Sequence, residues 1–220
     1  MTVEQEQMGI MDRLRTETRP HHDRAEQSEF GSSMMAKTLS LSAYKIHIAA
    51  HREVLRSIED AHESSDSPRI GEVWHDGLKK VPLLDADLDA LDHSTGEMPA
   101  EVREAVDRFV SMVERRASEK HESLPGVLYV LEGSTMGGTI LRKMIADSLD
   151  LTEGKGLDYY SVYGNDVRKH FMDFKERMTR AYEGTEHGDD LVDAAKETFD
   201  LVGDVMRSIP LNAKDEGADT

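Results

Sequence analysis

The sequence predicts an all-α protein, and three observations carry that prediction. Apolar residues recur at three- and four-residue steps along most of the chain, no stretch alternates as a half-buried strand would, and proline or serine marks most segment ends. A length of 220 residues suits one sizeable core better than two. We therefore expect a single helical-bundle domain over residues 1–209 and a disordered polar tail over residues 210–220.

Proline and small polar residues divide the first half of the chain. Residues 8–18 are amphipathic, and Pro20 breaks or kinks that helix before the pattern resumes over residues 21–27. Ser40 or Ser42 caps a long helix whose apolar residues keep helical spacing as far as Ile58. A loop with the sequence ESSDSP follows at residues 63–68, and shorter helices are expected around residues 72–78 and 85–91.

The second half contains the longer helices. Pro99 suits the first turn of a helix that runs to about residue 118. Ser123 and Pro125 open a helix that reaches about residue 149, and glycines interrupt the chain at residues 154–156. Two more helices are expected over residues 165–182 and 189–208, the second ending before Pro210.

The composition excludes several classes of function. The formal net charge is -17, from 44 acidic against 27 basic residues, and would repel nucleic acid and anionic membranes. With no cysteine, the chain has no disulfide, thiolate ligand or thiol nucleophile. The acidic N-terminus has no apolar signal region, and no apolar run is long enough to span a membrane, so a cytoplasmic location is expected.

The segment LYVLEGSTMGGTILRKMI, residues 128–145, has helical spacing but carries Gly133, Gly137 and Gly138. Each interior glycine destabilises a helix by about 1 kcal/mol relative to alanine. Gly133 and Gly137 are one turn apart and share a face with no side chains, which lets another body approach the backbone. From the glycines alone, a second helix packed on this face is the favoured interpretation, and a flat ligand is the alternative.

Histidines stand out in the segment LRTETRPHHDRAE, residues 14–26. Glu26 lies one turn after His22, and a carboxylate beside a neutral imidazole makes a good metal or heme ligand. The same pair is also compatible with a surface histidine making a local contact. Arg15 lies two turns before His22 on the same face, where it would either meet a ligand carboxylate or be solvated.

A third histidine pair, His47 and His51, has the four-residue spacing of a helical metal site. No further histidine or acidic partner completes such a site in the sequence. We therefore do not assign a metal here.

The first two segments together resemble the heme oxygenase family, particularly its bacterial branch associated with bacteriophytochromes. Leu14, Thr18 and His22, followed by Ala25-Glu26, match the segment that supplies the family's proximal heme ligand, and this register selects His22 over His21. Gly133, Gly137 and Gly138 match the family's distal Gly-x-x-x-Gly-Gly helix, within the bacterial form LYVLEGS. The segment YYSVYGNDVRKHFMDF, residues 159–174, resembles the turn and helix that carry a basic heme contact.

The resemblance, which spans residues 8–208, implies an activity and its co-reactants. Heme is then both substrate and cofactor, and the protein opens it with dioxygen to biliverdin, carbon monoxide and iron. Electrons come from a separate reductase or ferredoxin, because no flavin or nicotinamide fingerprint is visible. A biliverdin-binding photoreceptor is a possible recipient of the product.

The resemblance also implies roles for individual residues. His22 is the axial ligand of the heme iron and Glu26 its carboxylate neighbour, while Arg15, Tyr129 and Arg168 are candidate contacts of the heme propionates. Gly133, Gly137, Gly138 and Ser134 form the distal catalytic face. Ser134 stands where the animal enzymes have an aspartate that organises water, so a serine hydroxyl must orient that water here. Arg142 and Lys143 either belong to a basic patch that receives the reductase or are solvated.

A second class of function stays open at this point. A protein of the same fold can bind heme as a carrier or sensor without opening the ring. Related thiamin-compound hydrolases typically use a cysteine nucleophile that this chain lacks, and dimetal oxidases need several facing carboxylate and histidine ligands that we cannot assemble.

Overall fold

The computed structural model describes residues 8–93 and 98–211, and helices joined by short connections make up most of the described chain. It contains no β-strand within those ranges beyond isolated bridges at Thr152. The all-α prediction is therefore confirmed. The α-helices are α1 (Ile10–Glu17), α2 (Arg19–Glu26), α3 (Glu29–Ala36), α4 (Leu41–Glu63), α5 (Pro68–Val73), α6 (Val81–Ala90), α7 (Ala100–Glu119), α8 (Leu124–Leu149), α9 (Val167–Tyr182) and α10 (Gly188–Ser208).

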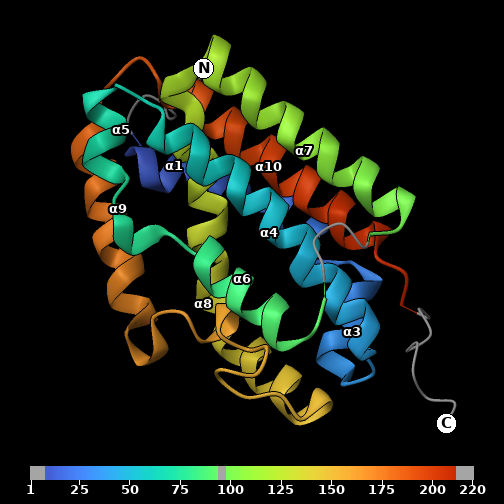
Figure 1. Ribbon diagram of the computed structural model, residues 1–220. Helices are drawn as coiled ribbons and strands as arrows, with labels where there is room; N and C mark the ends of the chain where they lie inside the picture. The colour runs from blue at the N-terminus through green and yellow to red at the C-terminus, as the bar shows by residue number, and fades with distance from the viewer. Residues whose placement is uncertain (1–7, 94–97, 212–220) are drawn as a thin grey trace, which may run out of the picture.

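The long helices form the bundle that positions every other element. In Figure 1, α7 runs beside both α4 and α10, and it packs against both. α10 also packs against α8, α2 and α1, so it joins the N-terminal helices to the glycine-bearing helix. The short helix α6 and the 3₁₀ turn η4 (Tyr159–Ser161) contact each other, and η4 packs on α8.

Most helix boundaries follow local capping chemistry. Ser40, and not Ser42, is the N-cap of α4, because its side chain accepts a hydrogen bond from the amide of Ala43. Pro20 lies in the first turn of α2, where its missing amide hydrogen costs nothing, so the chain forms two short helices that meet at Thr18.

Two segments differ from the sequence prediction. The helix α3 was not expected, yet Ser28 caps it by accepting from the Gly31 amide, and Phe30 and Met34 are buried on one face. The single helix predicted over residues 72–78 is instead two pieces, α5 and the 3₁₀ turn η2 (Asp76–Leu78), because the chain extends at Trp74 and His75. Tertiary burial decides both cases, since neither segment has strong helix propensity.

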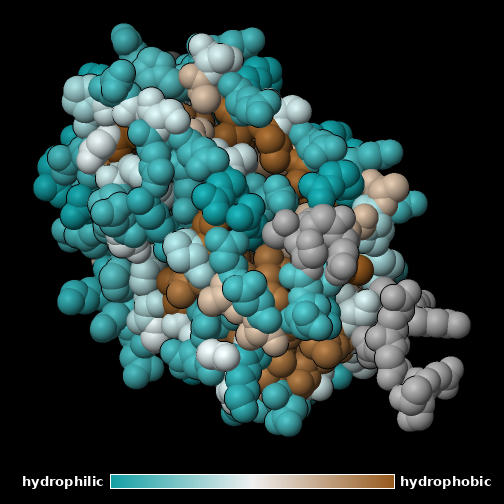
Figure 2. All heavy atoms as spheres, viewed as in Figure 1, coloured by the Kyte–Doolittle hydropathy of each residue, from teal (hydrophilic) through white to brown (hydrophobic). Residues whose placement is uncertain are grey.

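One continuous core runs through the bundle, and polar side chains cover it. On the face shown in Figure 2, hydrophilic residues predominate, with smaller areas of apolar residues among them. Among the described residues, no helix has the length and apolar character needed to cross a membrane. Of the predicted polar tail, residues 212–220 lie outside the described residues.

Candidate active site

The predicted proximal segment folds around Thr18, which ends α1 and begins α2. Leu14 is fully buried, and the buried Thr18 hydroxyl donates to the Leu14 carbonyl at 2.6 Å. The Thr18 carbonyl in turn accepts from the amide of His22 at 3.0 Å. In this segment Leu14 packs in the core and Thr18 joins the two helices. The His22 side chain is 40% exposed.

The His22 ring lies between two carboxylates and an aromatic residue. Its Nδ1 is 3.6 Å from Asp23 Oδ1 and 3.5 Å from Glu26 Oε2, and its edge meets Phe199 of α10 at 5.4 Å between ring centroids. This Nδ1 is buried and has no hydrogen-bond partner among the described residues. Both carboxylates stand just beyond hydrogen-bonding distance of it.

His21, the neighbouring candidate, is already engaged. Its Nδ1 lies 2.9 Å from Asp200 Oδ2 on α10, and Arg24 Nη2 lies 2.8 Å from the same nitrogen. Arg24 also donates to Asp200 Oδ1 at 2.9 Å. His21 is therefore held against α10 by these contacts, and His22 is the histidine of this segment whose ring is available to bind a ligand.

The helix α8 changes character at Gly133. The buried residues before that glycine are Leu124, Pro125, Gly126, Val127, Leu128, Val130, Leu131 and Glu132. After it, Thr135 and Ile145 are the only buried residues of α8. A Cβ atom added at Gly137 or Gly138 would meet nothing within 4 Å, and one at Gly133 would meet a single Phe171 atom at 3.9 Å. No helix packs closely on the Gly137–Gly138 face among the described residues, so helix packing does not explain these glycines.

Ser134 is exposed on this face and is held by its own helix. Its hydroxyl donates to the Leu131 carbonyl at 2.7 Å. Ser134 and Tyr159 line a cavity of about 90 Å³, together with His51 and Arg142. A cavity of that size holds ordered water when polar groups line it.

A buried ion pair fixes α8 one residue before the glycines. Glu132 and Lys80 are each 1% exposed and contact each other directly. Tyr163 donates to Glu132 Oε2 at 3.1 Å, while the Lys80 ammonium also donates to the Leu78 carbonyl at 3.0 Å. Charged side chains that are buried away from water need such partners. Removing one partner of a buried ion pair typically lowers the free energy of unfolding by about 3–5 kcal/mol.

The three candidate propionate contacts occupy different environments. Arg15 is 75% exposed and pairs with Asp12 at 3.2 Å, and Arg168 is exposed at the start of α9. Tyr129 is half-buried on α8. Burial raises the pKa of Tyr129, so its hydroxyl stays protonated and able to donate.

The histidine pair of α4 makes hydrogen bonds to tyrosines. His47 Nε2 lies 2.8 Å from the Tyr160 hydroxyl, and His51 Nε2 lies 2.7 Å from the Tyr159 hydroxyl. Burial lowers the pKa of His51 to about 4 and that of His47 well below its usual value, so both rings are neutral.

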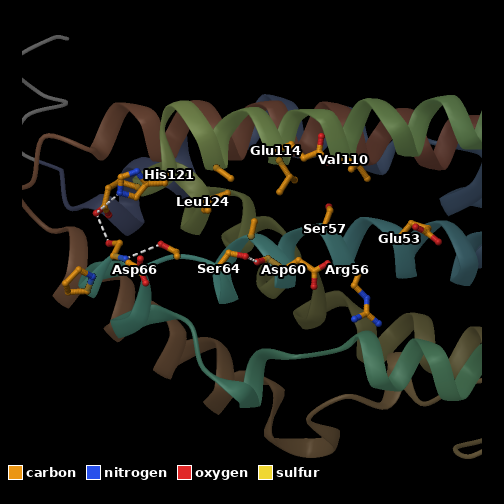
Figure 3. Close-up of a pocket in the computed structure, with 17 residues that line it drawn as sticks. Glu53, Arg56, Ser57, Asp60, Ser64, Asp66, Val110, Glu114, His121 and Leu124 are labelled. Carbon is orange, nitrogen blue, oxygen red and sulfur yellow. Dashed lines mark hydrogen bonds and ion pairs between the residues drawn. The ribbon is translucent and has the colours of Figure 1, made fainter.

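A cavity larger than the one beside Ser134 lies elsewhere. It has a volume of about 750 Å³, and Figure 3 shows side chains of α4 and α7 facing each other across it. Carboxylates and hydroxyls such as Asp60, Glu114 and Ser57 line it, and none of the predicted site residues does.

The comparisons with known proteins decide the family. The sequence matches the model of the heme oxygenase family over residues 8–208, which is nearly the whole chain. The chain belongs to the heme oxygenase family. The fold class, the family and the class of enzyme expected from the sequence are thereby confirmed, and no curated protein matches the sequence.

Solved structures give the same fold for this heme oxygenase family member. A heme oxygenase from Leptospira interrogans superposes with a TM-score of 0.82 at 23% identity, over 91% of this chain and 99% of that one. Heme oxygenase-1 of Synechocystis sp. PCC6803, solved in complex with heme, gives 0.79 at 20% identity over 90% and 91%. Heme oxygenase-2 of the same cyanobacterium, in complex with heme and NO, gives 0.83 at 18% over 92% and 85%.

Three contacts of the site were not predicted from the sequence. Phe199 lies about 180 residues from His22 in the chain, and its only signal is an aromatic residue on the apolar face of α10. Tyr159 lies at the start of the segment that resembles a family motif, but its contact with His51 had no signal in the sequence. The contact between Lys80 and Glu132 had none either, because in both cases the partner comes from another part of the chain.

Proposed function

We propose that this heme oxygenase family member opens heme to biliverdin, carbon monoxide and iron, with dioxygen as oxidant and electrons from a separate reductase or ferredoxin. The observation that carries the proposal is the pairing of a presented imidazole with an open glycine face in one fold. His22 supplies the imidazole, and Gly133, Gly137 and Gly138 supply the face.

The residues present fit heme. A neutral imidazole is the protein's ligand for the iron, and the buried Nδ1 of His22 faces Asp23 and Glu26, which are positioned to accept its proton. That leaves Nε2 as the nitrogen for the iron. The open space above Gly137 and Gly138 admits a flat group where any larger side chain would stand.

The heme supplies the oxygen-activating iron when it is bound, and the protein supplies orientation and protons. His22 would hold the iron, and Glu26 would hold the orientation of the His22 ring. The Ser134 hydroxyl, which lies on the glycine-bearing helix, would orient water beside the bound heme. Arg15, Tyr129 and Arg168 are proposed to bind the propionates, since each offers a hydrogen-bond donor near one of the two segments.

The proposal extends to the setting of the reaction. We propose that the enzyme is cytoplasmic and that Arg142 and Lys143 help to bind its electron donor. We also propose that a photoreceptor binds the biliverdin that the enzyme releases. Arg142 is held to Glu153 at 3.3 Å, while Lys143 is exposed, so Lys143 is the freer of the two for such docking.

The binding test uses His22→Ala with His21→Ala as its matched control. We expect His22→Ala to lose the axial ligation, seen in the Soret band and the iron–histidine resonance Raman mode after hemin titration. His21→Ala should keep both, because His21 is engaged with Asp200. An unchanged Raman mode in His22→Ala would make the assignment wrong.

The activity test separates an enzyme from a carrier or sensor. With hemin, dioxygen and an electron source, the protein should lose its Soret band, develop the red absorption of a bilin and release carbon monoxide. Protein that binds hemin, accepts electrons and binds dioxygen, but yields neither product, would be a heme carrier or sensor.

A further inference from the structure

Three side chains of α2 bring metal-binding atoms together around His22 Nδ1. Asp23 Oδ1 lies 3.6 Å from this nitrogen and Glu26 Oε2 lies 3.5 Å from it. All three ligand atoms lie within 4.8 Å of one another. Within residues 8–93 and 98–211, no other group of three histidine, aspartate or glutamate side chains is gathered as closely.

The nitrogen at the centre of this cluster has no partner in the described chain. His22 Nδ1 is buried and accepts or donates no hydrogen bond there. Its distances to the two carboxylates exceed the range of an N–H···O hydrogen bond. Because buried polar atoms in folded proteins are nearly always paired, this nitrogen indicates that a bound group completes the cluster.

The spacing of the three atoms fits a tetrahedral metal ion. Bonds from Zn²⁺ to imidazole nitrogen and carboxylate oxygen are about 2.1 Å long, so two corners of the tetrahedron lie about 3.4 Å apart. The observed separations of 3.5 and 3.6 Å are close to that value. Three protein ligands also leave the fourth position of the ion for water.

The charges around the cluster favour a cation. Asp23 and Glu26 are 45% and 68% exposed, so an ion reaches them from solvent. Arg19 Nε donates to Asp23 Oδ1 at 2.7 Å, and it is the cation paired with this carboxylate. A carboxylate has about four lone-pair sites and can keep that contact while it binds a metal.

We propose that His22 Nδ1, Asp23 and Glu26 bind one zinc ion in the heme-free protein, and that this ion excludes heme. The zinc site stands on the geometry of α2 alone. The exclusion of heme rests on the proposed function, because it requires His22 to be the ligand of the heme iron.

The tautomers of one imidazole ring explain the exclusion. A neutral imidazole has one lone pair for a metal, on the nitrogen that carries no proton. Zinc on Nδ1 leaves the proton of His22 on Nε2, whereas the heme iron needs the lone pair of Nε2. Heme ligation in turn places the proton on Nδ1, where Asp23 and Glu26 are positioned to accept it.

The proposed competition makes heme loading depend on the free zinc concentration. A competitor at ten times its own dissociation constant weakens the apparent affinity of the other ligand by about tenfold. The heme-free protein would therefore load with heme more slowly and less completely as free zinc rises.

The first measurement needs no heme. Calorimetric titration of the heme-free protein with ZnCl₂ should give one ion per chain, and His22→Ala should lose it. Asp23→Asn and Glu26→Gln should each weaken it by at least about tenfold, since each removes one charged ligand. Co²⁺ bound in place of zinc should show the strong visible absorption of a tetrahedral ion.

Two variants outside the cluster are the controls. His21→Ala removes the neighbouring imidazole, which is held by Asp200 at 2.9 Å, and Glu29→Gln removes an exposed carboxylate at the start of α3. Both should keep the zinc affinity of the parent protein. Several weak ions per chain, or equal losses in the controls and in the cluster variants, would mean an adventitious ion only and overturn the site.

The second measurement is hemin titration with and without zinc at ten times its dissociation constant. The apparent hemin affinity of the parent protein should fall by about tenfold, while that of Glu26→Gln should change much less at the same zinc concentration. An unchanged hemin affinity in zinc-loaded parent protein would overturn the exclusion. Failure of the zinc-free parent to bind hemin would count against the proposed function, and the calorimetry would still test the zinc site.

Discussion

Two glycines of the same helix, Gly126 and Gly137, have opposite surroundings. A Cβ atom at Gly126 would stand 2.2 Å from the Leu191 carbonyl oxygen, because α8 and α10 cross there with their backbones nearly in contact. A Cβ atom at Gly137 would meet nothing within 4 Å. One glycine lets the protein pack on itself, and the other keeps a surface clear.

The comparison shows that α8 has a buried, packed half and a half whose glycine face is open. The first half is buried and ends at Glu132, whose charge is matched by Lys80. The second half carries three glycines and the exposed Ser134. Because the first half is fixed by packing and by an ion pair, the second half can leave its face open without the helix moving.

The largest expected effect comes from breaking the ion pair that separates the two halves. Lys80→Met leaves the Glu132 carboxylate buried without its cation, and we expect a loss of about 3–5 kcal/mol in the free energy of unfolding. Urea denaturation measures it. The double variant Lys80→Met/Glu132→Leu should recover much of the loss, because it removes both charges.

Lys79→Met is the matched control for that substitution. Lys79 is the preceding residue, and it pairs with Glu63 and Asp76 at the surface. It should leave the unfolding midpoint nearly unchanged, as exposed pairs contribute little. Equal losses in Lys79→Met and Lys80→Met would show that the buried pair does not anchor α8.

The next effect is at the helix crossing. In Gly126→Ala the new methyl group meets backbone atoms of Leu191, which cannot turn away as a flexible side chain does. We expect α8 and α10 to move apart at a loss of about 1–3 kcal/mol in urea denaturation. A variant as stable as the parent protein would mean that the crossing is looser than the structure shows.

The smallest effect has the opposite sign. Gly137→Ala adds a methyl group in open space and removes an unfavourable residue from a helix interior, so the protein should gain about 0.5–1 kcal/mol in the same denaturation experiment. Destabilisation by this substitution would indicate that the glycine face packs on protein after all.

The sequence predicted what depends on local spacing and on motif register. The helix pattern, the register that selects His22 and the clustered glycines are all local features. The structure confirms the helices, while the roles of His22 and of the glycine face in binding heme stay predictions. Helix α3 escaped prediction because Gly31, Ser32 and Ser33 have weak helix propensity, and burial of Phe30 and Met34 outweighs it.

Contacts between distant segments could not be predicted. Gly126 looks like any helical glycine in the sequence, and only the crossing with α10 shows why it is there. His51 and Tyr159 are 108 residues apart, so their spacing within each segment says nothing about their pairing. The spacing of His47 and His51 fits a helical metal site, and no metal was assigned there. Their tyrosine partners could not be predicted, because Tyr159 and Tyr160 come from another part of the chain.

The central claim is that the face around Gly137 is kept open for heme. Hemin titration of Gly137→Leu tests it most directly, with the unfolding free energy measured on the same samples. Gly71→Leu is the control, because Gly71 of α5 also has open space at its Cβ position and lies outside the glycine face. We predict that Gly137→Leu stays folded but binds hemin at least about tenfold more weakly, a change of 1.4 kcal/mol, while Gly71→Leu binds it normally. A Gly137→Leu protein with the parent's hemin affinity and Soret band would contradict the account.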